Sequence, residues 1–270
     1  LDATAQNARI TLTLDQGKWA EVWSLLAKEE GAVPAAQMRT ARKLETIELG
    51  LRSLVSAAGG TNAAALRSFI KQGQAALAKA TPIDRSETAF QLLFASYLAA
   101  HGGENRLAAE TLEQLGPGWA STDYPVLSRM HAAASAELAR RSGKPEEALR
   151  LLRAQPIDDS ALILTHVVLM DALADSGDAK AARAQAHWLK THRGRAYAEY
   201  NGDWMLRPWN VAQTSLALLR SAELAAAAGD MPQASSELDA FTQVWPQAAG
   251  EAGLAKRIGT LRQRLAPAKP

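Results

Sequence analysis

Apolar residues recur three and four positions apart along almost the whole chain, which is the spacing of one face of an α-helix. No stretch of the sequence alternates apolar and polar residues in the way that a half-buried strand requires. Prolines and glycine-containing segments interrupt the helical pattern at intervals. The pattern predicts an all-α protein with helices over residues 2–15, 18–30, 35–57, 62–79, 85–101, 104–115, 124–141, 144–154, 159–176, 178–191, 210–228, 231–244 and 251–265.

Three junctions between predicted helices share one sequence pattern, a glycine followed five positions later by an alanine. The three segments are SGKPEEALRLL, SGDAKAARAQA and AGDMPQASSEL, with glycines at Gly143, Gly177 and Gly229 and alanines at Ala148, Ala182 and Ala234. Residues 16–26 and 101–112 are weaker copies. Glycine tolerates a positive φ and closes a tight turn, and a small alanine lets two helices approach closely. We therefore expect antiparallel helix pairs in contact at these alanines.

The spacing of these junctions resembles that of tetratricopeptide-repeat proteins. Gly143 and Gly177 are 34 residues apart, which is the period of that repeat. The resemblance covers residues 124–245, and it extends only loosely over residues 1–115. It implies an α-α superhelix, a right-handed stack of antiparallel helix pairs. The chain departs from the family where its first helices carry aliphatic residues in place of the usual aromatic ones, so we expect irregular pairs.

The repeat also predicts how the chain is organised. Irregular helix pairs occupy residues 1–115 and tetratricopeptide-like pairs occupy residues 116–270, in one continuous solenoid. Gly229 follows Gly177 by 52 residues, one period plus about 18, so residues 192–210 form an insertion. The segments HWLKTHRGRAYAE, RPWNVAQ and LLRSAELAAAAGD also resemble the helical-repeat tails of modular bacterial regulators, such as membrane-anchored winged-helix activators.

Composition narrows the classes of function. The 30 basic and 28 acidic residues leave a net charge of +2, with no basic cluster to favour nucleic acid or an anionic membrane. The longest apolar run, residues 161–174, is too short to span a bilayer. The absence of cysteine fits bacterial cytoplasm and periplasm equally. The start at LDATAQ, without a methionine or a signal sequence, leads us to expect a part of a longer chain.

Catalytic patterns are missing from the sequence. The five histidines lack the spacing of a metal site, and no serine lies in a nucleophile elbow. The segment AAGGTN lacks the lysine of a phosphate-binding loop. We therefore expect no enzymatic activity, no catalytic residues, no metal and no cofactor.

An acid stands six residues before each of the three glycines: Glu137, Asp171 and Glu223. In tetratricopeptide arrays the first helices line the concave groove, so the resemblance implies a ladder of carboxylates that faces a partner. The alternative is local pairing, because Arg140 and Arg141 lie beside Glu137 and Arg220 lies three residues before Glu223.

The insertion combines arginines with aromatic residues. Arg193, Arg195 and Tyr197 suggest an accessible binding surface, because guanidinium groups are costly to bury unpaired. Trp204 and Trp209 are expected to be buried as a structural plug between repeats. A helix extending from His187 to Tyr200 and a small hairpin at YAEYNGDW both remain open.

Two functions follow from these observations. The first is a non-enzymatic interaction scaffold that binds a peptide or a partner protein in a concave groove, without direct contact to nucleic acid. The second is a regulatory or sensory ligand-binding domain of a larger modular bacterial protein, such as a transcription regulator. Neither the partner nor the oligomeric state follows from the sequence.

Overall fold

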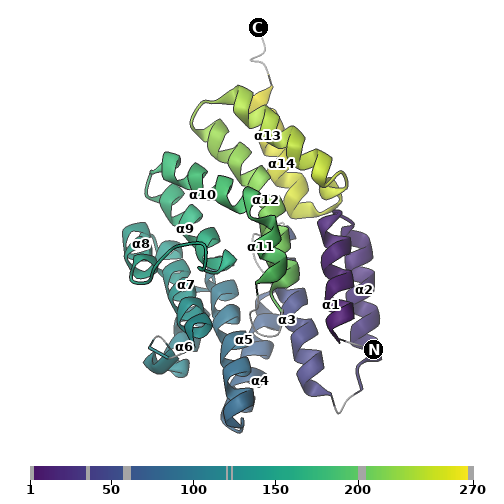
Figure 1. Ribbon diagram of the computed structural model, residues 1–270, viewed down its shortest axis with the longest axis vertical. Coiled ribbons are helices and arrows are strands. Elements are labelled where there is room, and N and C mark those ends of the chain that lie inside the picture. Colours follow the sequence, from purple (N-terminus) through teal and green to yellow (C-terminus); the bar gives the residue numbers. More distant parts are fainter. Residues whose placement is uncertain are drawn as a thin grey trace.

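The regular structure of the chain is helical throughout the part that the structure describes. A computed structural model describes residues 3–34, 37–56, 62–119, 121–122, 124–199 and 205–266, and it contains no strand within them. The all-α prediction is thus confirmed (Figure 1). The helices are α1 (Ala3–Asp15), α2 (Trp19–Ala32), α3 (Met38–Val55), α4 (Ala63–Leu77), α5 (Pro82–His101), α6 (Asn105–Leu115), α7 (Pro125–Arg141), α8 (Pro145–Arg153), α9 (Ile163–Asp175), α10 (Ala179–Thr191), α11 (Arg193–Ala198), α12 (Arg207–Ala227), α13 (Met231–Val244) and α14 (Ala252–Leu265), with 3-10 turns η1 (Pro117–Trp119) and η2 (Ala248–Gly250).

Helix pairs joined by short glycine turns are the repeating unit. The glycine after α1, α5, α7, α9 and α12 has a positive φ in each case, between 70° and 88° (Gly17, Gly103, Gly143, Gly177 and Gly229). At Gly143, Gly177 and Gly229 an added Cβ would meet nothing within 4 Å, so the left-handed backbone, and not lack of space, selects glycine there. The predicted turns are confirmed, including both weaker copies.

Close contact between paired helices centres on the residue five positions after each glycine. Ala148, Ala182 and Ala234 are fully buried, as are Val22 and Ala108 at the equivalent positions of the weaker copies. Each lies on the second helix of a pair, which packs against the first. The predicted register is therefore correct for all five pairs.

Replacing Ala182 by leucine is expected to lower the free energy of unfolding by about 1–3 kcal/mol, because the added methylenes overpack the α9–α10 contact. Chemical denaturation followed by circular dichroism measures the change. The matched control is Ala184→Leu, at an exposed position of the same helix, where little change is expected. Equal effects of the two substitutions would contradict the assigned contact.

Helix α9 begins later than its apolar pattern predicts, at Ile163 instead of residue 159. Asp158 holds a turn before the helix, with its carboxylate accepting a hydrogen bond from the Ser160 amide at 2.8 Å. The first amide of the helix donates to the carboxylate of Glu199 at 2.8 Å. A distant acid thus caps this helix, and the local sequence contained no sign of it.

The first helices of successive pairs lie side by side. Helix α5 packs on α7, α7 on α9, and α9 on α12. Helices α3 and α14 complete this layer, since each contacts α12 and they contact each other. We call α3, α5, α7, α9, α12 and α14 the inner helices.

The two ends of the described chain pack together (Figure 1). Helix α1 lies on α12, and the ring of Trp19 meets that of Trp245 edge to face, with centroids 5.3 Å apart. The Trp23 indole donates to Glu251 at 2.9 Å. One core cluster consequently combines residues between 10 and 55 with residues between 212 and 261, whereas the other runs from residue 49 to residue 224. The predicted division at residue 115 and the predicted single solenoid stay predictions.

Part of the insertion is buried, as predicted for a plug. Trp209 is 1% exposed and packs edge to face against Phe94 and Tyr97, with centroids 5.7 and 5.8 Å away. Its burial is confirmed. Tyr200 and Trp204, with the Asn201-Gly202 pair of the hairpin alternative, lie outside the described residues. Before them α10 ends at Thr191, His192 interrupts the helix, and α11 is a separate helix that ends at Ala198, so the predicted single helix from His187 to Tyr200 is wrong.

Candidate functional site

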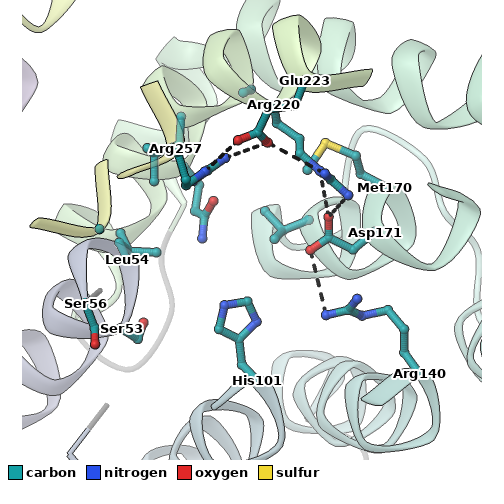
Figure 2. A pocket seen from close by; sticks show the side chains of 15 residues that line it. Ser53, Leu54, Ser56, His101, Arg140, Met170, Asp171, Arg220, Glu223 and Arg257 are labelled. Atoms are coloured by element: carbon teal, nitrogen blue, oxygen red, sulfur yellow. Dashed lines mark hydrogen bonds and ion pairs between the residues drawn. The ribbon is translucent and has the colours of Figure 1, made fainter. Parts of the chain in front are cut away.

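A cavity of about 270 Å³ lies among the inner helices, all six of which contribute to its lining (Figure 2). Five of the lining residues are apolar: Leu54, Val167, Met170, Leu216 and Ala217. Six others carry charged or titratable groups: His101, Arg140, Asp171, Arg220, Glu223 and Arg257. Gln213, Ser53, Ser56 and Gly253 complete the lining.

Glu137 lies behind this lining on α7 and is 1% exposed. Its carboxylate accepts two hydrogen bonds from Arg140, at 2.7 and 2.8 Å, and lies 2.9 Å from Nδ1 of His101. Burial alone would raise the pKa of Glu137, but the hydrogen bonds from Arg140 and His101 outweigh it and lower that pKa to about 2. Because an ionised carboxylate only accepts, Nδ1 of His101 carries the proton of this hydrogen bond.

Asp171 and Glu223 each lie between two guanidinium groups (Figure 2). Asp171 is 3.1 Å from Arg220 and 4.0 Å from Arg140. Glu223 receives two hydrogen bonds from Arg257, at 2.7 and 2.9 Å, and lies 3.6 Å from Arg220. Burial would raise the pKa of Glu223, but the charges of Arg257 and Arg220 lower it below its usual range. We call the series Glu137, Arg140, Asp171, Arg220, Glu223 and Arg257 the ion-pair network.

The three predicted acids are thus brought together by the structure. They project from equivalent positions of α7, α9 and α12, and the local pairs Glu137–Arg140 and Glu223–Arg220 are both present. Sequence reasoning missed His101 and Arg257. On α5, His101 lies four residues after the position that is equivalent to the three acids. Arg257 lies after the last glycine of the repeat, so the repeat pattern does not extend to it.

The other predicted site residues lie elsewhere. Arg193 pairs with Asp15 and donates to the Ser215 hydroxyl at 3.0 Å, and Arg195 donates to the Ala161 carbonyl at 2.8 Å. These side chains are 33% and 28% exposed, and neither lines the cavity. Burial and the adjacent Asp15 raise the pKa of the partly buried Tyr197 to about 12. The ligand role predicted for residues 193–197 stays a prediction. The guanidinium groups of Arg193 and Arg195 already form hydrogen bonds within the chain.

Two histidines pack as aromatic rings. His166 and His192 stack on Trp188 at centroid distances of 3.5 and 4.1 Å. Over the described part of the chain, no three histidine or acidic side chains are grouped so that they could hold a metal ion. The described helices also include none that is long and apolar enough to cross a membrane.

Comparison with known proteins gives no family for this chain. No protein-family model matches it, and neither a curated protein nor a solved structure matches it. The resemblance to tetratricopeptide repeats and to bacterial regulators therefore stays a prediction. The identified features are the all-helical fold, its packed helix pairs and the charged cavity among them.

Proposed function

We propose that the chain is a non-enzymatic binding domain, and that a small polar molecule binds in the cavity among the inner helices. One observation carries this proposal: helices from both ends of the chain converge on one cavity whose lining combines apolar residues with five ionic side chains. Ligand sites typically pair an apolar lining with a few polar groups that fix orientation.

The ion-pair network supports the proposal through its energetic cost. Removing charges from water is expensive, and well-packed apolar residues often replace buried ion pairs without loss of stability. Arg140 is only 7% exposed, and its guanidinium contacts acids from both α7 and α9. A network that stability alone does not require is therefore consistent with a role in recognition.

The geometry favours a small molecule over an extended peptide. If the array is the predicted superhelix, its concave side is the layer of inner helices. On that side α3 and α14 contact each other, and both helices line the cavity. A volume of about 270 Å³ is near the lower end of the range for small-molecule sites, which begins at roughly 300 Å³. In a larger modular protein such a domain would act as a sensory or regulatory unit.

A thermal-shift screen of small polar metabolites tests the proposal. A compound present at about 100 times its Kd stabilises the folded chain by about 2.7 kcal/mol, which raises Tm by roughly 5 °C or more. We expect at least one compound to do so with the unmodified chain. The effect should disappear in Leu54→Trp, where the larger indole side chain fills part of the cavity.

The matched control is Leu12→Trp, the same substitution at an exposed leucine of α1 that does not line the cavity. It should keep the shift. A shift that survives in Leu54→Trp would place the ligand elsewhere, and a screen without any stabilising compound would contradict the binding function.

A further inference from the structure

The ionic groups around the cavity alternate in sign. Around the cavity, Arg140 is followed by Asp171, Arg220, Glu223 and Arg257, so that each acid stands between two guanidinium groups (Figure 2). Glu137 and Asp175, which do not line the cavity, form ion pairs with Arg140 and balance its charge. A ligand with only a negative charge would therefore be repelled by Asp171 and Glu223, and a ligand with only a positive charge would be repelled by the guanidinium groups.

Hydrogen-bonding capacity of both kinds is left over in this ring. Arg257 uses Nε and Nη2 for Glu223, and within the described chain its Nη1 makes no hydrogen bond. Asp171 accepts a hydrogen bond from Nε of Arg220 on Oδ1, whereas its Oδ2 is 4.0 Å from the nearest Arg140 nitrogen, beyond hydrogen-bond length. The cavity thus presents a charged donor and a charged acceptor.

Gln213 adds an uncharged hydrogen-bonding group to the lining. It lies on α12, lines the cavity and is 8% exposed. Its side-chain amide, with two donors and one acceptor, has no hydrogen-bond partner among the described residues. The amide atoms are not among the fully buried polar atoms without a partner, so a molecule in the cavity can reach them.

From these groups we infer that the cavity binds a zwitterion, and specifically a free α-amino acid with an apolar side chain. This inference rests on the proposed function and deepens it. The ligand carboxylate binds Arg257 and the Gln213 amide, and the ammonium group binds Asp171. The side chain packs against the apolar lining residues Met170, Val167 and Leu216. Opposite charges close together in one ligand suit an alternating ring better than either charge alone.

Isothermal titration calorimetry of the full chain tests the ligand class. The probes are L-leucine, L-methionine and L-valine, with 4-methylpentanoate and 3-methylbutylamine as analogues of leucine that lack the ammonium or the carboxylate group. We expect at least one amino acid to bind, and each leucine analogue to bind at least about 10-fold more weakly than leucine, because every missing group leaves a charged partner unsatisfied.

Two variants locate the binding. Gln213→Leu keeps the size of the side chain and breaks no hydrogen bond of the described chain, so it should fold and bind the amino acid roughly 10-fold more weakly. Gln243→Leu, at an exposed position of α13, should bind as the unmodified chain does.

The possible failures are distinguishable. If the analogues bind as tightly as leucine, or if none of the three amino acids binds while another compound still gives a shift that Leu54→Trp abolishes, the zwitterion class is wrong and the binding function stands. An unchanged affinity in Gln213→Leu would also overturn the assignment. If no compound of any class binds, the proposed function itself fails.

Discussion

Replacing Trp245 by alanine is expected to lower the free energy of unfolding by about 3–5 kcal/mol, the usual cost of removing a fully buried large aromatic side chain. Trp245 contacts Trp19 and Phe241, and its ring lies so close to Gly17 that an added Cβ there would be 2.8 Å from it. Urea denaturation measures the loss. Trp119→Ala is the control, because this tryptophan is only partly buried, and its replacement should cost less.

Hydrogen exchange shows where that loss acts. Since Trp245 joins the C-terminal helices to α1 and α2, amides of α1 and α2 should lose protection in the variant, whereas amides of α7 to α10 should keep theirs. A uniform loss of protection along the chain would mean that the contact between the chain ends is not a separable unit.

Replacing Glu137 by glutamine is expected to cost about 3 kcal/mol at neutral pH, because Arg140 is left without its main buried counter-charge. The cost should depend on pH. The pKa of Glu137 falls from 4.5 in a model peptide to about 2 in the folded chain. Its ionised form therefore stabilises the fold above about pH 4.5, and this stabilisation is lost as the pH falls towards 2.

Urea denaturation of both chains at several pH values between 7 and 2.5 measures the difference. It should be largest at neutral pH and shrink through the acid range. Glu147→Gln is the matched control, since Glu147 forms an exposed ion pair with Arg150 three residues along one helix, and exposed pairs of this kind contribute little. A difference for Glu137 that does not vary with pH would contradict the shifted pKa.

Sequence reasoning succeeded where the physical cause is local. A turn that needs a positive φ requires glycine at a fixed place, so Gly143, Gly177 and Gly229 marked the pairs and placed Ala148 and its equivalents in the core. The same register aligned Glu137, Asp171 and Glu223. Local spacing also predicted the pairs Glu137–Arg140 and Glu223–Arg220, whereas Arg141, the other neighbour named for Glu137, forms no ion pair with it.

Long-range contacts explain what the sequence could not predict. Arg257 pairs with Glu223 across 34 residues and His101 with Glu137 across 36, so each contact joins two helices and depends on how those helices pack. The packing of α1 on α12 depends on how the helices between them pack, which single helix patterns do not specify. The arginines of residues 193–197 were expected at a groove edge because a lone guanidinium avoids burial, whereas Asp15, far away in the sequence, pairs with one of them.

The contact between the chain ends sets the order in which the protein can fold during synthesis. Trp23 and Glu251 are 228 residues apart, so helices α1 and α2 leave the ribosome long before their partners exist. Pairs such as α7–α8 and α9–α10 can form as soon as both of their helices are made, whereas the first two helices must keep an apolar face exposed until α12 to α14 arrive. At roughly 5–20 residues per second that interval lasts at least about ten seconds, during which a chaperone has access to Trp19 and Val22.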